Sequence, residues 1–143
     1  MLADRSLADG DALDGGDGER GSAVVDFVLV GVLVVVLLLG VLQVAVYVHV
    51  RNVVVASAQE GARYAANADV PAELGAARTV EVVGRATSPQ TAAGLSCASA
   101  QETDVSGLTL VVVRCTGAVP SLIGALGDVL PIDVAGRAVA ELP

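Results

Sequence analysis

An apolar run near the N-terminus constrains this chain more than any other feature. Residues 27–42 follow one another without a polar side chain, and within residues 24–48 the only polar interruptions are Asp26, Gln43 and Tyr47. At about 1.5 Å per helical residue, this segment spans roughly 37 Å, enough to cross a hydrocarbon core ~30 Å thick with some tilt. A core helix of a soluble protein would be shorter and would have a polar face. The run therefore predicts one transmembrane helix.

The rest of the composition limits what can follow this helix. Roughly ninety residues come after it, so at most one small domain is expected there. The chain has one Phe, two Tyr and no Trp, so its core must consist of small aliphatic side chains. It has no lysine, and its eight arginines are spread singly, without a basic cluster that would neutralise a row of phosphates. We therefore expect no nucleic-acid binding.

The sequence contains no recognisable catalytic or metal-binding pattern. His49 is the one histidine, which excludes a site built on several histidines and favours a role at the membrane interface beside Tyr47 and Arg51. There is no G-x-S-x-G, H-E-x-x-H, P-loop or CxxC motif. The acids near the N-terminus do not have the spacing of a calcium-binding loop. We predict no enzymatic activity, no metal and no cofactor.

Two cysteines, Cys97 and Cys115, both follow the apolar run. An even number of cysteines in a small domain on a membrane anchor is compatible with a disulfide in an oxidising compartment. The alternative is a pair of buried, unreactive thiols. If the domain lies outside the cytoplasm, we predict a Cys97–Cys115 bond, which would help to stabilise a small core.

Residues 1–21 differ sharply from the run that they precede. They contain five glycines, six acids and two arginines, and they offer too little apolar surface to offset the entropy of ordering them. A secretory signal peptide has a basic start and an apolar stretch of ~7–15 residues, whereas this start is acidic and the run is longer. We predict a disordered acidic leader over residues 1–21.

The junction of leader and run carries a specific pattern. Arg20-Gly21-Ser22, with Asp26 four residues later, resembles the processing region of type IV pilins and pseudopilins. In that family a hydrophilic leader ends in Gly, a prepilin peptidase cuts directly after it, and an acid occupies the fifth mature position. The resemblance implies Gly21 as the last leader residue, Ser22 as the new N-terminus and Asp26 as the assembly acid. The family usually has Glu where this chain has Asp26, which is one methylene shorter.

A physical argument supports a role for this acid. A carboxylate inside a spanning helix costs up to roughly 3 kcal/mol at mid-membrane on insertion scales, so one that persists there usually has a partner or a function. Cleavage after Gly21 would create an α-amino group about one helical turn before Asp26. The amine could pair with Asp26 of its own chain or of a neighbour, and the resemblance implies the neighbour. Alternatively, Asp26 reaches the interface or caps the helix.

The helix is expected to continue past the membrane, so that it covers residues 22–67. Ser57, Gly61 and Ala65 recur there at four-residue spacing, a small-residue stripe that lets another helix approach closely. The approaching helix belongs either to another subunit or to this chain's own head. The stretch A-Q-E-G-A-R-Y-A-A, residues 58–66, resembles the TadE-like family, pseudopilin-like proteins of the tight-adherence (Flp-type) pilus machinery.

Residues 68–143 are predicted to form a small α+β head. It would have two or three antiparallel strands, covered on one face by one further helix and by the end of the long helix. The first expected element is a helix that starts at Asp69-Val70-Pro71, with Asp69 as the capping acid, and ends before Ser88. Ala76, Val80 and Val83 would lie on one face of this helix, and Glu81 and Arg85 would form an i,i+4 pair on another. A loop over 91–104, which could include a short strand at Cys97, a strand from Leu108 to 117, a short helix over 121–126 and a half-buried strand over 132–142 would follow.

The resemblance implies a TadE-like pseudopilin that takes part in the assembly of a Flp-type pilus. Its partners would be the membrane, a prepilin peptidase, the major pilin, other pseudopilins and the assembly platform. The leader would lie in the cytoplasm and the head outside, with possible transfer to the pilus after processing. The alternative is a permanently anchored single-pass membrane protein with a small extracellular binding head.

Overall fold

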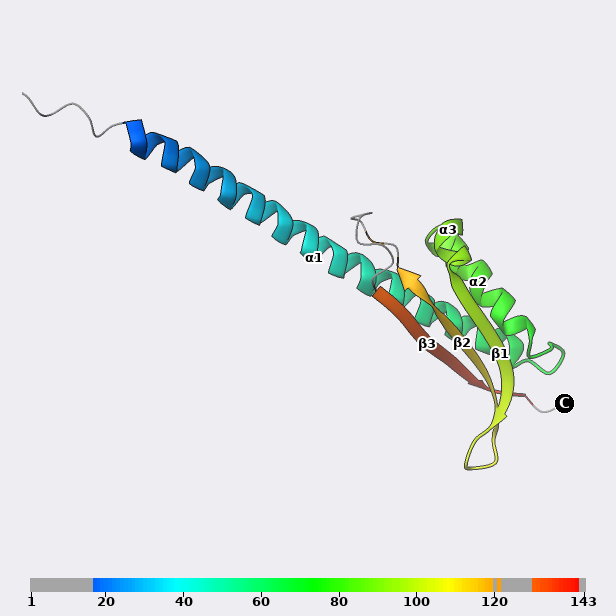
Figure 1. Cartoon of the computed structure of the whole chain (residues 1–143). Helices are drawn as coiled ribbons and strands as arrows, with labels where there is room; N and C mark the ends of the chain where they lie inside the picture. Colours follow the sequence, from blue (N-terminus) through cyan, green and yellow to red (C-terminus); the bar gives the residue numbers. More distant parts are fainter. Residues whose placement is uncertain (1–16, 120, 122–129, 142–143) are drawn as a thin grey trace, which may run out of the picture. The chain divides into compact units, whose positions relative to one another are not determined.

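The computed structural model describes residues 17–119, 121 and 130–141 of the 143 residues (Figure 1). It divides into two compact units, Met1–Val41 and Leu42–Pro143, and one continuous helix crosses their boundary. The elements in chain order are α1 (Asp17–Ala65), α2 (Leu74–Ala86), α3 (Pro89–Ala93), β1 (Leu95–Thr103), β2 (Thr109–Val119) and β3 (Leu130–Val139). This composition confirms the predicted α+β class.

The first part of α1 has an apolar surface on every side. All of residues 21–42 are exposed, and 78% of the surface of Phe27 is accessible. In the part of the chain that the structure describes, α1 is the one helix long and apolar enough to cross a membrane. Since no part of this segment has a polar face, it fits a lipid environment and a single-pass membrane protein.

The helix begins before the predicted end of the leader. Residues 17–21 form the first turn of α1, whereas a disordered leader was expected up to Gly21. A helix that is stable from Ser22 onward can extend toward its N-terminus at little cost, and acids in the first turn favour this through the helix dipole. The remainder of the predicted leader, residues 1–16, lies outside the described residues.

The head contains one antiparallel sheet in the order β1-β2-β3. Cys97 on β1, Cys115 on β2 and Val134 on β3 lie side by side across it. Along β3, buried Ile132, Val134 and Gly136 alternate with residues that are exposed or, at Ala135, half-buried, which confirms the predicted half-buried strand. The strand predicted from Leu108 is also confirmed, as β2.

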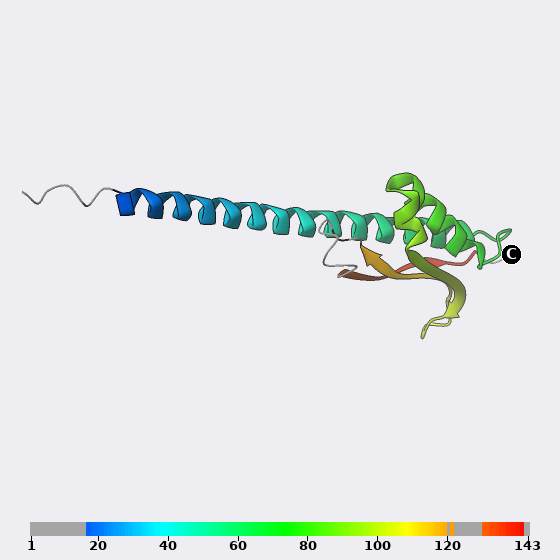
Figure 2. The same cartoon turned by 45° about the horizontal axis from the view of Figure 1, so that its top comes forward.

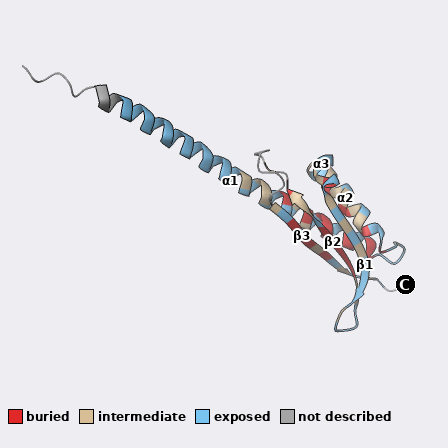
Figure 3. Cartoon of the chain, viewed as in Figure 1, coloured by how far each residue is buried: buried red, intermediate tan, exposed pale blue. Residues whose placement is uncertain are grey.

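Two helices cover one face of this sheet, namely the second part of α1 and α2 (Figure 2). Burial is concentrated where these helices meet β2 and β3 (Figure 3). The main core consists of Val50, Val54, Ala58, Ala62, Val83, Ala92, Val113, Cys115, Val119, Ile132 and Val134. It contains no aromatic residue, as the composition predicted, and α1 supplies four of its members.

The expectation of a loop over residues 91–104 is wrong. Instead, α3 ends at Ala93 and β1 occupies nine residues, from Leu95 to Thr103. The segment is rich in Ser and Ala, which have little preference for strands, so its local sequence gave no strand signal. It is a strand because it pairs with β2 along its whole length and is bonded to it through Cys97.

The second helix starts later than predicted. Asp69 and Pro71 lie in turns, and α2 begins at Leu74 without a side-chain cap from its own N-terminus. The Ala76 N–H donates to Ser99 Oγ on β1 at 3.0 Å, and that hydroxyl donates to the Ala72 carbonyl at 2.7 Å. A tertiary contact thus takes over the capping role predicted for Asp69.

The remaining details of α2 agree in part with the prediction. Arg85 pairs with Glu81 at 3.4 Å, as the i,i+4 spacing indicated. The fully buried face, however, is formed by Gly75, Thr79 and Val83, whereas Ala76 and Val80 are half-buried. The short helix predicted over 121–126 falls outside the described residues, apart from Ser121.

Candidate functional site

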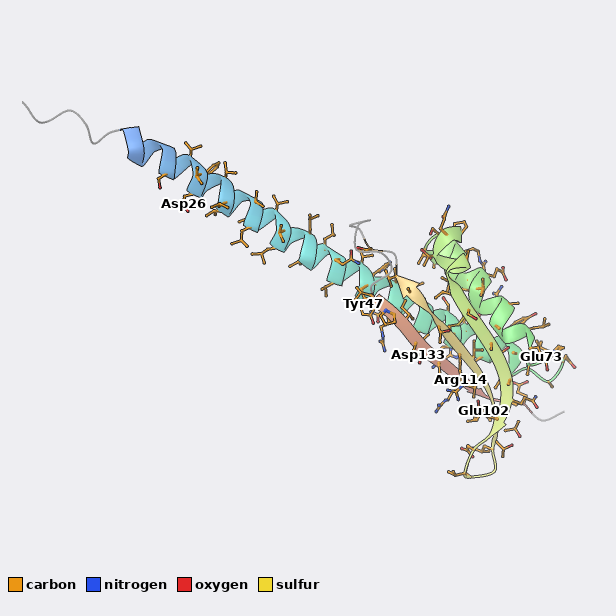
Figure 4. All side chains as sticks on the ribbon, viewed as in Figure 1. Asp26, Tyr47, Glu73, Glu102, Arg114 and Asp133 are labelled. Atoms are coloured by element: carbon orange, nitrogen blue, oxygen red, sulfur yellow. A yellow bond between two sulfur atoms is a disulfide. The ribbon has the colours of Figure 1, made fainter. Side chains whose placement is uncertain are left out.

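Gly21, Ser22 and Asp26, the residues of the predicted processing junction, lie together near the start of α1. With Val25 and Leu29 they line one shallow hollow on a single face of the helix. Ser22 and Asp26 are four residues apart, so their Cβ atoms are neighbours at about 5–6 Å. Asp26 is exposed and projects from the helix surface (Figure 4). An amine at Ser22 would therefore lie within one turn of this carboxylate.

Gly21 is not required by the fold. A Cβ placed on it would meet no atom within 4 Å, and its φ is not in the left-handed region. Glycine inside a helix costs about 1 kcal/mol relative to alanine, so its presence at an open helical position has no local benefit. Something other than the packing of this chain must account for it.

The small-residue stripe has a different environment. Ser57, Gly61 and Ala65 are all buried, and α2 lies against Gly61 and Ala65 through Gly75 and Thr79. A Cβ on Gly61 would overlap the Thr79 hydroxyl and would lie 2.5 Å from the Gly75 carbonyl oxygen. The close approach predicted from the stripe is therefore present, and the approaching helix is this chain's own α2.

The G-A-R stretch divides between the core and the surface. Gly61 and Ala62 are buried, whereas Arg63 is exposed. The neighbouring Tyr64 ring lies 5.7 Å from the guanidinium of Arg78, which also pairs with Glu81 at 3.1 Å. These groups lie on the outer surface of α1 and α2, and within the described residues no group of three or more His, Cys, Asp or Glu side chains has the arrangement of a metal site.

Cys97 and Cys115 form a disulfide between β1 and β2. The two residues are directly opposite each other, with their Cα atoms 4.1 Å apart. Cys115 is fully buried, and Cys97 is half-buried at the edge of the same core. Of the two alternatives left open by the sequence, the structure has the bonded form.

The contact between α1 and the edge of the sheet was not predicted. The Tyr47 hydroxyl donates to the Pro131 carbonyl at 3.3 Å, and the Arg137 N–H donates to Gln59 Oε1 at 3.3 Å. Between these two points a Cβ on Gly136 would overlap the backbone of Ala58. The helix thus runs along β3 and satisfies polar backbone groups at its outer edge, which would otherwise be open to pairing with another chain.

The comparisons with known proteins bear on the same segment. A family model described as TadE-like protein matches residues 21–63. No match was found among curated proteins or among solved structures. The matched segment starts at Gly21 and ends at Arg63, so it covers Gly21, Ser22 and Asp26, the apolar run and the first half of the G-A-R-Y-A-A stretch. Residues 21–63 are therefore similar to the TadE-like family, as the resemblance predicted, and this similarity suggests a function related to Tad pili.

Proposed function

We propose that this chain is a TadE-like pseudopilin that takes part in the assembly of a Flp-type pilus. It enters the membrane with residues 1–21 in the cytoplasm, and a prepilin peptidase hydrolyses the Gly21–Ser22 bond. In this reaction the oxygen of one water molecule becomes part of the new Gly21 carboxyl group, and a proton from that water goes to the new Ser22 amine. The processed chain packs by α1 against the major pilin and other pseudopilins at the assembly platform.

The observation that carries this proposal is Gly21 itself. The residue is exposed on an apolar helix, its Cβ position is empty, and yet it is glycine. A peptidase that accepts only a residue without a side chain before the cleaved bond would explain it. The same bond precedes Asp26 by one turn, so cleavage supplies a cation to a carboxylate that is otherwise costly in a membrane.

The disulfide supports the proposed orientation. Disulfides persist in oxidising compartments and are rare in the cytoplasm. The Cys97–Cys115 bond lies in the head, beyond the membrane helix, so a head outside the cytoplasm is the arrangement consistent with it. The opposite end of α1, with the leader, then lies inside.

The burial of the small-residue stripe limits which part of α1 can contact other subunits. Since Ser57, Gly61 and Ala65 are buried within the head, they are not available for packing against another subunit. The exposed apolar surface of residues 21–42 is the part of α1 that remains for helix packing between subunits. We therefore assign assembly contacts to this segment, with Asp26 setting their register.

One observation favours the alternative of a permanently anchored membrane protein. The helix passes through Gly21–Ser22 without a break, so the junction has no loop that marks it as a cleavage site. In that case the leader stays attached, and the head binds an envelope component or another external ligand.

Intact-mass measurement of the membrane-extracted protein separates the two functions. In cells with an active prepilin peptidase we expect a chain that begins at Ser22, and in cells without it a chain that retains residues 1–21. Gly21→Leu should leave the full-length chain in both. A wild-type chain that still carries its leader in the presence of the peptidase would support the permanent anchor instead.

Replacement of Asp26 tests the role of the acid. Asp26→Ala should leave membrane insertion and cleavage intact, because it removes a cost of insertion, but it should reduce incorporation into pili at least tenfold if the carboxylate sets the register. Asp26→Glu, which keeps the charge, is the matched control and should assemble. The measurement is the amount of this chain in sheared pili, and equal amounts for Ala and Glu would exclude a register role.

A further inference from the structure

The bond that is proposed to be cut lies inside a helix. Because α1 begins at Asp17, the Gly21–Ser22 peptide is in its second turn. In an α-helix each N–H donates to the carbonyl four residues earlier, so the Gly21 carbonyl accepts from the Val25 N–H and the Ser22 N–H donates to the Gly18 carbonyl. Both sides of this peptide are engaged in the helix.

Hydrolysis needs a different arrangement of this peptide. The attacking oxygen must reach the carbonyl carbon, and donors of the enzyme must bind the carbonyl oxygen as negative charge develops on it. In α1 that oxygen already accepts a hydrogen bond, and the surrounding turns of the helix limit access to the carbon. The first turns of α1 must therefore open before the bond can enter an active site.

The sequence makes this opening easy. Helices fray from their ends, and glycine has a weak preference for the helix because it loses the most backbone freedom there. Gly18 and Gly21 both lie within the first five residues of α1. At Gly21 neither packing nor backbone conformation requires glycine, so the weakened helix is not a by-product of the fold.

We propose that unwinding of the first turns of α1 controls processing, so that the stability of the helix over residues 17–22 sets the rate at which Gly21–Ser22 is cut. This inference rests on the proposed cleavage and adds its regulation. Anything that holds residues 17–22 helical keeps the precursor intact, and anything that frees them commits it to the mature form.

Substitution at Gly18 tests this control without touching either residue of the cleaved bond. Alanine favours the helix most, valine is intermediate and glycine favours it least. We expect Gly18→Ala to be cut about fivefold more slowly than wild type and Gly18→Val by a smaller factor. Gly40→Ala, which makes the same change at an open helical position far from the cleaved bond, is the matched control and should be cut at the wild-type rate.

The order of the two variants distinguishes helix stability from steric exclusion. A peptidase that simply rejects side chains at residue 18 would cut Gly18→Val most slowly, because valine is the larger residue. The measurement is the time course of leader loss by mass spectrometry, with purified full-length chain in detergent and a prepilin peptidase. Amide hydrogen exchange at Ser22 and Val25 in the uncut chains is measured in parallel. It should be slowest in Gly18→Ala, intermediate in Gly18→Val and fastest in the wild type, which is the order expected for cleavage.

The possible failures are distinct. Equal cleavage rates for all four chains, or valine slower than alanine, would overturn the control by unwinding while leaving the proposed cleavage in place. If no chain is cut, including the wild type, both the cleavage and its control are overturned.

Discussion

At the scale of single residues, the glycines of α1 and the head fall into two groups. Gly61, Gly75 and Gly136 lie where two backbones approach so closely that a Cβ would meet neighbouring atoms at 3.1 Å or less. Gly21, Gly31 and Gly40, all in α1, face open space. The first group is explained by packing within this chain, whereas the second needs an explanation outside it.

Replacement of Gly61 should therefore destabilise the head. The new methyl group of Gly61→Ala would overlap the Thr79 hydroxyl and the Gly75 carbonyl, and because the latter is backbone, α2 must move. We expect a loss of about 2–3 kcal/mol in the free energy of unfolding. Gly84→Ala is the control, since its methyl group would lie 3.5 Å from Ala92 Cβ, an ordinary contact, and should be neutral or stabilising. Denaturant unfolding, monitored through amide exchange in β2, measures the free energy of unfolding of both variants. Equal stability of Gly61→Ala and Gly84→Ala would contradict the close packing of α2 against Gly61.

A second residue-scale prediction concerns the β1–β2 hairpin. One carboxylate oxygen of Asp104 accepts hydrogen bonds from the Ser106 hydroxyl, the Ser106 N–H at 2.7 Å and the Leu108 N–H at 3.1 Å. These hydrogen bonds lower the pKa of Asp104 below its ordinary value of 3.8, and the bond from the Ser106 hydroxyl has the largest effect. The folded state therefore favours the charged form of Asp104. The contribution of this carboxylate to the stability of the folded protein is fully present above pH 3.8, and it is lost as the pH falls through the lowered pKa.

The matched variants are Asp104→Asn, which keeps an acceptor without the charge, and Asp104→Ala, which removes both. At pH 6 we expect the thermal unfolding midpoint to fall in the order Asp, Asn, Ala, by small amounts because Asp104 is only half-buried and lies in a surface turn. On acidification below the pKa of Asp104, the difference between Asp and Asn should disappear. A difference that does not change with pH would show that the charge makes no contribution.

At the scale of elements, β1 is the part of the head with the least support of its own. From Ala98 to Thr103 all of its residues are exposed apart from half-buried Ser99. Its remaining links to the head are its pairing with β2, the contact of Ser99 with α2, and the disulfide. The salt bridge between Arg114 and Glu102, at 3.1 Å, is exposed and adds little.

Removal of the disulfide should therefore affect β1 before the rest of the sheet. Closing a loop between cysteines 18 residues apart contributes about 3 kcal/mol by restricting the unfolded chain. The double variant Cys97→Ala/Cys115→Ala should lose about this amount, and amide exchange should accelerate more in β1 than in β3. Reduction of the wild-type chain with a thiol should reproduce the effect. Unchanged exchange in β1 would mean that its pairing with β2 is sufficient.

At the scale of the whole molecule, α1 has two roles along its length. Residues 21–42 have a surface suited to lipid, whereas Val50, Val54, Ala58 and Ala62 belong to the core of the head. The compact unit that contains the head therefore includes α1 from Leu42 onward. The head cannot be regarded as a domain appended to a separate membrane helix.

Two truncations test this division. A chain of residues 42–143 keeps the four core residues of α1 and should fold, with protected amides in β2 and β3. A chain of residues 66–143 lacks them and exposes one face of the sheet, so it should be unfolded or aggregate. Amide exchange and circular dichroism measure the outcome, and a folded 66–143 chain would show that α1 is dispensable to the head.

The sequence by itself determined the features that depend on local composition. The length and uniformity of the apolar run specify a membrane helix, and the β-branched residues of β2 and the alternation of β3 specify strands, because each pattern reports on residues that are neighbours in the chain. The placement of Gly21, Ser22 and Asp26 close together was also predictable in this way, since their spacing along one helix fixes their spacing in space.

The tertiary structure alone decided the features that depend on contacts between distant residues. The pattern of Ser57, Gly61 and Ala65 indicated a close helix approach but left open which helix makes it, and that helix is α2 because Gly75 and Thr79 fit against Gly61. The strand β1 and the start of α2 depend on Cys115 and Ser99, respectively. No local preference encodes such partners, because the free energy that fixes them is gained only when separate segments meet.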